Sequence, residues 1–438
     1  MAAVVAAAAV AGVAVVRRDL PDPAGRPAPT GTAAAGTTAT GPRDRPASVP
    51  ERPWPTRSPG WTARGAADRL DGPPGVHGAV AVGGMVLTVG GDPGHGRLAA
   101  YDARTGAPRW RSRAGEAATV WAASPRAVVV GSDQGELAAL DPGTGRRRWR
   151  LRLAPGQGPD AATLSGDHLV VETSFPGEGD LRPPVLLALD ARTGRRRWRA
   201  VLRRGTDLQW APPVRVEGLV LVASTPSDPR IAAGDALHAL DAATGRPRWA
   251  VPLPSRGPSF HGEQPLVHRG LVIVPAAGAL VAVDPGSGRE VWRRPTPSPP
   301  RLVGATGGLV LAVAGDGLVA LSAADGRERW RLALADRHRW AALGAGRVYA
   351  LAAGLAMAVD PATGRVLWGT LTGAAVGPPL AVGGRLYVPT TRGLEAKEAS
   401  TGQIAWFGDW RQLTGGAVAA GGRVVVATRD GDLLGYDP

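Results

Sequence analysis

The chain has 438 residues, a net charge of +14 and no cysteine, which excludes a disulfide framework and a thiolate metal site. Its 62 glycines and 41 prolines are typical of an all-β protein rich in tight turns. Lys397 is the only lysine, so the basic residues are almost all arginine. We interpret this bias as a property of the genome and not as chemistry.

The chain begins with a run of small apolar residues, Ala2 to Val16. This run is shorter than the about 20 residues that span a bilayer, but it fits the hydrophobic region of a signal peptide. Arg17 and Arg18 follow the run instead of preceding it. Either the true start lies upstream of Met1, or the run is an anchor that leaves the rest of the chain in the cytoplasm. We predict a signal or anchor over 1–18 and an extracytoplasmic protein, membrane-anchored or secreted.

The next segment, 19–59, is rich in Pro, Ala, Gly and Thr and has no hydrophobic period. Such a composition cannot bury enough apolar surface to fold. We therefore predict a disordered linker here, which separates the apolar run from the rest of the chain.

From residue 60 onward one motif recurs to the end of the chain. Its clearest copy is Leu186-Leu-Ala-Leu-Asp190-Ala-Arg-Thr193-Gly194-Arg-Arg-Arg-Trp198, which predicts a strand, a tight Asp-to-Gly turn and a second strand. The motif tryptophans step by 39, 49, 51, 43, 38, 38 and 38 residues, which fits a four-stranded propeller blade. We predict that these tryptophans dock neighbouring blades. The repeat positions are Asp102 and Trp110, Asp141 and Trp149, Asp190 and Trp198, Asp241 and Trp249, Asp284 and Trp292, Trp330, Asp360 and Trp368, and Trp406.

This motif resembles the repeat of the PQQ-like, or quinoprotein-type, β-propellers, Ala-x-Asp-x-x-Thr-Gly-x-x-x-Trp. The resemblance covers about Trp61 to Pro438, although Ser322 and Glu398 replace the aspartate in two copies. It implies a propeller that is either a quinoprotein dehydrogenase or similar to the BamB-type scaffolds of outer-membrane protein assembly, which lack catalysis. The positions that match one for one are Ala188, Asp190, Thr193, Gly194 and Trp198.

The number of blades follows from counting strands, which we name A to D from the centre of the ring outward. Nine C strands are present, but only eight internal D strands. The strand at Trp61 can supply the ninth and pair beside Leu433 to Tyr436, which removes the open edges. Relatives of this repeat usually have eight blades. We predict an all-β fold for 60–438, a closed β-propeller of eight to nine four-stranded antiparallel blades.

The quinoprotein dehydrogenases bind PQQ and Ca²⁺ in the central funnel, with an asparagine at the calcium and two adjacent cysteines over the cofactor. This chain has no asparagine and no cysteine. We therefore expect no cofactor, no metal and no catalytic residue, because function depends on the site and not on the fold. His261 and His268 flank Glu263 in the sequence. These residues have a structural role or, as the alternative, form a metal site.

Two B–C connections are long, 173–184 and 224–235, and they project from one face of adjacent blades. Insertions on one face of a repeat ring often mark the binding face, and neutral variation of surface loops is the alternative. Four tryptophans outside the motif fall where strand D passes to strand A, at the same face. They form our candidate partner face, against the alternative of extra packing. They are Trp121, Trp210, Trp340 and Trp410.

Arginines gather on two outermost strands, around Arg146–Arg148 and Arg195–Arg197. They protect strand edges or attract anionic lipid or wall polymer. Nucleic acid is not expected as a partner, since no exposed aromatic residues are interleaved with these arginines. We predict a monomeric, non-enzymatic scaffold of the cell envelope that presents one loop face to a protein or peptide. The alternative is a ligand- or cofactor-binding propeller that uses the central funnel.

Overall fold

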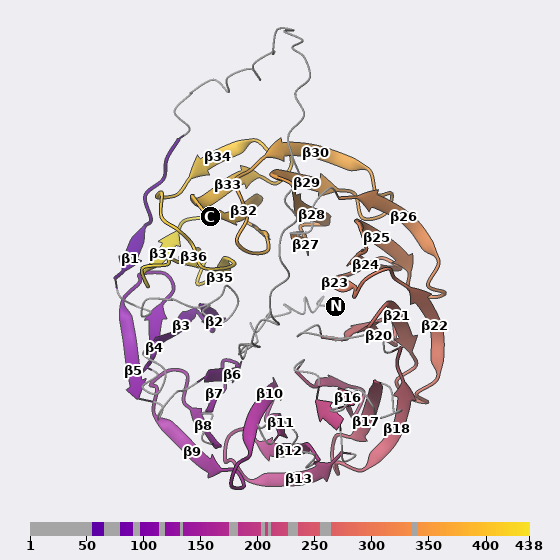
Figure 1. Ribbon diagram of the computed structural model, residues 1–438. Coiled ribbons are helices and arrows are strands. Elements are labelled where there is room, and N and C mark those ends of the chain that lie inside the picture. Colours follow the sequence, from indigo (N-terminus) through magenta and orange to yellow (C-terminus); the bar gives the residue numbers. More distant parts are fainter. Residues whose placement is uncertain are drawn as a thin grey trace, which may run out of the picture.

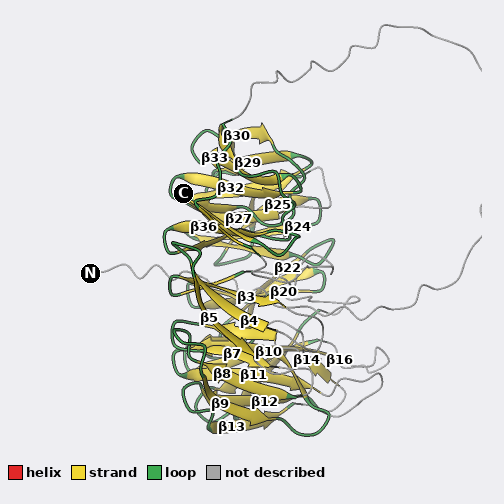
Figure 2. Cartoon of the chain, turned by 90° about the vertical axis from the view of Figure 1, so that its left-hand side faces the viewer, coloured by secondary structure: helices red, strands yellow, loops and turns green. Residues whose placement is uncertain are grey.

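The computed structural model describes residues 55–64, 79–90, 97–113, 119–131, 135–174, 183–202, 206–208, 212–226, 235–254, 264–334 and 340–438. Within these ranges the chain forms strands and connections, with no helix, and so no helix suited to crossing a bilayer. The strands make nine sheets that follow one another around a ring (Figure 1). Seen from the side, the ring is a flat disc of these sheets (Figure 2). The predicted closed propeller is confirmed, with nine blades.

Each blade is an antiparallel meander whose first strand lies at the centre of the ring and whose last strand lies at its rim (Figure 1). Blades 1 to 3 are β2 (Val80–Val82), β3 (Met85–Gly90), β4 (Arg97–Asp102), β5 (Pro108–Arg113); β6 (Thr119–Ala123), β7 (Val128–Gly131), β8 (Glu136–Leu140), β9 (Arg147–Arg152); β10 (Gly158–Ser165), β11 (His168–Ser174), β12 (Val185–Asp190), β13 (Arg196–Val201). Blades 4 to 6 are β14 (Thr206–Leu208), β15 (Val214–Val216), β16 (Leu219–Pro226), β17 (Ala236–Asp241), β18 (Pro247–Pro252); β19 (Leu266–His268), β20 (Leu271–Ala276), β21 (Ala279–Val283), β22 (Glu290–Pro295); β23 (Arg301–Thr306), β24 (Leu309–Ala314), β25 (Gly317–Ser322), β26 (Glu328–Ala333). Blades 7 to 9 are β27 (Trp340–Gly344), β28 (Arg347–Ala352), β29 (Leu355–Val359), β30 (Val366–Leu371); β31 (Leu380–Val382), β32 (Arg385–Thr390), β33 (Gly393–Glu398), β34 (Ile404–Phe407); β35 (Val418–Ala420), β36 (Arg423–Ala427), β37 (Leu433–Tyr436), β1 (Trp61–Ala63).

Burial explains the sequence pattern of the strands. The third strand of a blade is covered on both faces by the adjacent blades, so Val185 to Leu189 of β12 are all buried. In the outermost strand only the side chains that point toward the neighbouring strand layers are buried. In β13, Trp198 is therefore buried between exposed Arg197 and Arg199. The core is therefore a set of apolar layers between neighbouring blades.

The Asp-to-Gly turn is held by the aspartate side chain. Asp190 Oδ1 accepts hydrogen bonds from the backbone N–H of Thr193 at 3.0 Å and from its hydroxyl at 2.9 Å. The Arg197 guanidinium, together with these bonds, lowers the pKa of Asp190 to about 2. Gly194 has a φ of +71°, which favours glycine.

In eight of the nine blades the tryptophan of the outer strand docks on the turn of the next blade; the exception is Trp406 of blade 8, whose Nε1 is buried without a hydrogen-bond partner among the described residues. Trp149 Nε1 donates to the carbonyl oxygen of Ala191 at 2.8 Å, and a Cβ on Gly194 would lie 2.7 Å from the Trp149 ring. The same indole bond recurs around the ring, so the repeat holds adjacent blades together. The donors and carbonyl partners are Trp61 and Ala103, Trp110 and Pro142, Trp198 and Ala242, Trp249 and Pro285, Trp292 and Ala323, Trp330 and Pro361, and Trp368 and Ala399.

The ring closes with a strand from each end of the chain. β1 pairs antiparallel with β37, with Trp61 opposite Gly435, as the strand count predicted. The residues before β1 continue onto blade 8: Thr56 forms a parallel bridge with Phe407, and the Arg57 guanidinium lies 5.5 Å from the Trp406 ring centroid. The chain thus contacts the ring before the boundary at residue 60 that the sequence indicated.

Blade 4 departs from the simple meander. Its central edge is divided, since β14 and β15 both pair with β16, at opposite ends of that strand. A four-stranded blade, as predicted, has a single inner strand, so the divided edge differs from the prediction. Trp210 and the residues 175–182 and 227–234 of the two long connections lie outside the described residues.

Candidate partner-binding surface

Trp121 lies on the inner strand β6 of blade 2. The register of β6 with β7 shifts between Val120 and Ala122, so Trp121 occupies an irregular position in the strand. The indole is half-buried and packs in the layer between blades 2 and 3, where its Nε1 would lie 2.7 Å from a Cβ placed on Gly131. This Nε1 is buried without a hydrogen-bond partner. Most of the Trp121 contact surface therefore belongs to the core.

Trp340 lies at the start of β27, the inner strand of blade 7. Its indole is half-buried, and the Arg301 guanidinium of blade 6 lies 5.1 Å from the ring centroid. This distance suits a cation–π contact, and the indole also packs against the core layer between blades 7 and 8.

Trp410 is the most exposed of the described tryptophans outside the motif, with 66% of its surface accessible. It lies in the connection from β34 to β35 and stacks on Phe407, with ring centroids 6.2 Å apart and planes 13° from parallel. The Phe407–Trp410 pair continues a buried aromatic group in which Trp406 stacks on Tyr436 at 5.3 Å. A rigid, exposed aromatic pair of this kind is suited to contact with a protein.

The described tryptophans of the candidate face are spread around the ring. Trp121 belongs to blade 2, Trp340 to blade 7 and Trp410 to the connection between blades 8 and 9. They do not form one cluster, and Trp210 lies outside the described residues. A shared role for them stays a prediction.

Glu172 is a fully buried carboxyl group in β11, directly after the apolar residues Leu169 to Val171. Its neighbours across the sheet are Ala161 and Leu186, and both of its carboxylate oxygens are without a hydrogen-bond partner. Burial raises the pKa of Glu172 well above its usual value, and the nearby Asp160 raises it further. The folded protein therefore holds a proton on this side chain more tightly than the unfolded chain does.

This burial predicts a pH-dependent stability. Folding raises the pKa of Glu172, so the folded state keeps the proton at pH values where the unfolded chain has lost it. The protein is therefore destabilised as the pH rises above the pKa of an unfolded glutamate. We expect Glu172→Gln to stabilise the protein by about 1–3 kcal/mol at pH 8 relative to its effect at pH 4. Urea denaturation at the two pH values checks this. Glu217→Gln, in an exposed turn, should have equal effects at both, and an equal effect for Glu172→Gln would contradict the prediction.

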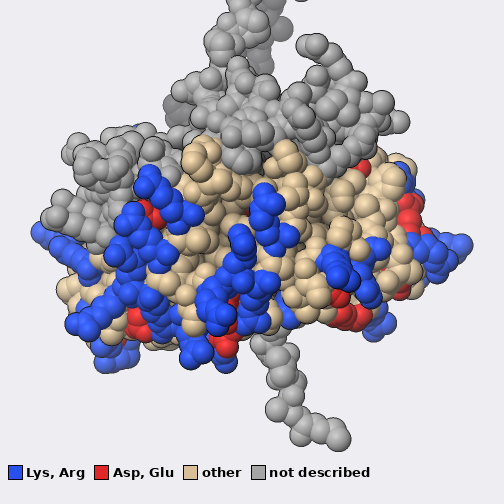
Figure 3. Space-filling view, turned by 90° about the horizontal axis from the view of Figure 1, so that it is seen from below, with Lys and Arg blue, Asp and Glu red and all other residues tan. Residues whose placement is uncertain are grey.

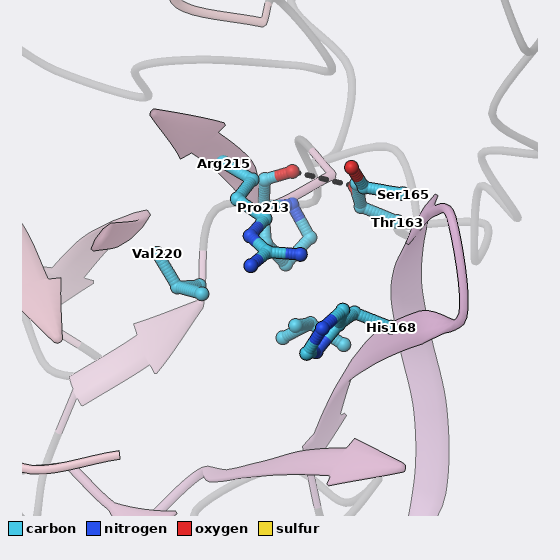
Figure 4. Close-up of a pocket in the computed structure, with 7 residues that line it drawn as sticks. Thr163, Ser165, His168, Pro213, Arg215 and Val220 are labelled. Carbon is cyan, nitrogen blue, oxygen red and sulfur yellow. Dashed lines mark hydrogen bonds between the residues drawn. The ribbon is translucent and has the colours of Figure 1, made fainter. Parts of the chain in front are cut away.

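A small hollow lies between blades 3 and 4, on the side of the turn that joins β10 to β11 (Figure 4). The Arg215 guanidinium and the His168 ring are turned toward the same space, and the Thr163 hydroxyl donates to the Pro213 carbonyl oxygen at 2.5 Å. Burial, with Arg215 and Arg197, lowers the pKa of His168. The enclosed space of the hollow measures about 10 Å³, far below the about 300–1,000 Å³ of typical ligand pockets. It is a poor fit for a cofactor.

The donor groups also fit poorly to a metal and to PQQ. No group of three or more His, Asp or Glu side chains with metal-binding geometry occurs among the described residues. His261 and Glu263 lie outside them, and His238 hydrogen-bonds Ser224 at 2.8 Å, which suits a structural role. The chain lacks the asparagine and the cysteines that the quinoprotein resemblance implies. We therefore derive no chemical step through this cofactor.

Comparison with known families identifies the repeat. The family model described as outer membrane protein assembly factor BamB matches residues 54–182, 94–208, 182–343, 276–374 and 352–438, which together span the whole ring. The chain belongs to this family. The predicted PQQ-like propeller repeat is thereby confirmed. A search of curated proteins finds no match to this chain.

Solved structures of a BamB protein and of dehydrogenases share this fold. BamB from Moraxella catarrhalis is 18% identical, with a TM-score of 0.54, over 86% of this chain and 98% of that one. A europium-containing methanol dehydrogenase is 14% identical, with a TM-score of 0.54, over 84% of each chain. Quinohemoprotein alcohol dehydrogenase ADHIIG from Pseudomonas putida HK5 is 16% identical, with a TM-score of 0.53, over 86% of this chain and 75% of that one. At these identities the likeness concerns the fold alone.

Proposed function

We propose that this protein is a non-enzymatic scaffold of the cell envelope that binds a protein or peptide through the face carrying its D–A and B–C connections. The observation that carries the proposal is the match of the BamB family model across all nine blades. The apolar run Ala2 to Val16 and the linker 19–59 support an extracytoplasmic location, with the ring tethered or secreted.

The surface favoured for the partner is built around Trp410 and Phe407, with Trp340 as the second contact. Trp410 has a large exposed ring that is held in place by stacking on Phe407. Binding a partner therefore costs little side-chain entropy at this position. Trp340 lies one blade away on the inner side of the same face. Trp121 and Trp340 both pack against core layers, so the exposed Trp410 is the principal contact.

Capture of envelope proteins by the full chain tests the proposal. We expect the Trp340→Ala, Trp410→Ala double variant to lower capture of the recovered partner by at least about tenfold. Val366→Ala is the matched control. Val366 is 41% exposed, but it is the first residue of β30 and lies at the end of that strand away from the D–A connections. A double variant that folds and captures its partner at wild-type strength would contradict the assigned surface.

The alternative is a ligand- or cofactor-binding propeller that uses the central funnel. The fold that this chain shares with two dehydrogenases is the observation that favours it. Titration of the purified protein with PQQ and Ca²⁺ distinguishes the two functions. The scaffold predicts no saturable binding, whereas stoichiometric binding of PQQ would favour the alternative.

A further inference from the structure

The outer strands of blades 1 to 3 form a continuous basic surface, which we call the basic arc. It consists of β5, β9 and β13, which contain many arginines and no acidic residue. Arginine side chains spread across this edge of the ring (Figure 3). The arginines of the arc are Arg109, Arg111, Arg147, Arg148, Arg150, Arg152, Arg196, Arg197 and Arg199.

Part of this charge is neutralised by the blades themselves. Arg148 pairs with Asp141 at 2.5 Å, Arg197 pairs with Asp190 at 2.7 Å, and Arg109 and Arg150 have similar partners. The remaining exposed arginines of the arc make no ion pair with any described residue. They are Arg111, Arg147, Arg152, Arg196 and Arg199. The arc thus keeps a surplus of positive charge on its solvent side.

The opposite arc of the ring shows that this surplus is not a general property of the fold. In blades 5 and 6 the outer strands contain their own acids: Glu290 pairs with Arg293 at 2.5 Å, and Glu328 pairs with Arg331 at 2.9 Å. Arg294 of β22 also reaches Glu328 of β26, at 3.3 Å. The outer strands of these two blades thus carry two glutamates against four arginines, whereas those of blades 1 to 3 carry no acidic residue.

Protection of strand edges does not explain the basic arc. Every outer strand presents an edge, so protection by charge would be needed on each. Yet β30 of blade 7 has no charged residue and leaves Val366 and Leu371 exposed, Leu371 at 68%. The ring thus tolerates an outer strand without charge. Edge protection therefore does not explain why arginines are concentrated on three consecutive blades.

The shape and chemistry of the arc indicate the partner. The arc follows the convex rim of the ring (Figure 1), which a flexible chain can follow and a flat bilayer can touch only locally. Its aromatic residues, Trp110, Trp149 and Trp198, are buried, so no exposed ring is available to stack on a base. Guanidinium groups form paired hydrogen bonds with phosphate. We propose that the basic arc binds a flexible, phosphate-bearing polyanion without bases.

Binding of inorganic polyphosphate to the full chain, measured by titration calorimetry, tests this proposal. The arc variant Arg147→Gln, Arg152→Gln, Arg196→Gln, Arg199→Gln should bind at least about tenfold more weakly than the wild type. The control Arg289→Gln, Arg329→Gln, Arg365→Gln, Arg392→Gln removes the same charge from exposed positions elsewhere on the ring and should change affinity less than about twofold. Equal losses in the two variants would overturn the proposal.

Salt and competing surfaces give a second measurement that does not depend on the variants. Wild-type binding to polyphosphate should weaken as NaCl is added, because exposed charges are screened. Binding that does not respond to salt would contradict the assignment. So would a wild type that binds phosphatidylglycerol vesicles or single-stranded DNA but not polyphosphate, because the occupant would then be a membrane or a nucleic acid. Failure here leaves the proposed protein-binding face intact, since that face does not include the arc.

Discussion

Removal of residues 1–64 is expected to open the ring and lower the melting temperature sharply, whereas removal of residues 1–54 should leave it almost unchanged. The longer deletion takes away β1, so β37 loses its outer partner and becomes an open edge. It also removes Trp61, which is 9% exposed and donates to Ala103 of blade 1. Loss of a buried tryptophan alone costs about 3–5 kcal/mol.

Calorimetric melting of the two truncated chains beside the full chain measures this effect. Trp61→Ala in the full chain is the matched point variant and should reproduce part of the loss. A third truncation, 1–57, isolates the contacts of Thr56 and Arg57 with blade 8 and should fall between the other two. Equal melting of the 1–54 and 1–64 truncations would show that β1 does not close the ring.

Lys397→Ala is expected to destabilise the protein by about 3–5 kcal/mol, because it leaves a buried carboxylate without its cation. Lys397 is fully buried in blade 8, its Nζ donates to the Leu371 carbonyl oxygen at 2.8 Å, and the same atom lies 3.5 Å from Glu395 Oε2. Glu395 also accepts from the Thr372 hydroxyl at 2.7 Å and from Gly373 N–H at 2.8 Å. Burial lowers the pKa of Lys397, and Glu395 opposes that shift.

The repeat offers a matched control for this pair. Ala138 and Leu140 hold the corresponding positions in blade 2, where the layer is wholly apolar. The double variant Glu395→Ala, Lys397→Leu should therefore be close to the wild type in its free energy of unfolding, since replacing a buried ion pair by apolar residues is often neutral. Urea denaturation of both single variants and the double variant completes the cycle. A Lys397→Ala loss below about 1 kcal/mol would contradict the account.

The ring architecture could be predicted because the repeat combines a local signal with a contact between blades. Asp190, Thr193 and Gly194 specify a turn by their own hydrogen bonds and backbone conformation. The same turn receives Trp149 of the preceding blade, so one motif determines both the strand order and the docking. Counting its copies was sufficient to predict the ninth outer strand at Trp61.

The surface could not be predicted in the same way. The repeat determines where a residue lies along a blade, but a register shift beside Trp121 changes how much of its side chain faces the funnel. Glu172 follows three apolar residues in β11, and the sequence does not indicate that its carboxyl lacks a partner. The contact of residues 55–57 with blade 8 falls in a segment without hydrophobic period, so only the structure revealed it. The divided inner edge of blade 4 was missed for a similar reason.

The central claim, that the face with the D–A and B–C connections binds a protein partner, is tested most directly by site-specific photo-crosslinking in the native envelope. A photoreactive amino acid would replace Trp410 in one chain and Val366, at the opposite end of an outer strand, in another. The account predicts a discrete crosslinked protein from position 410 and none from position 366. Crosslinking from position 366 alone, or from neither position in cells where the protein is abundant, would contradict it.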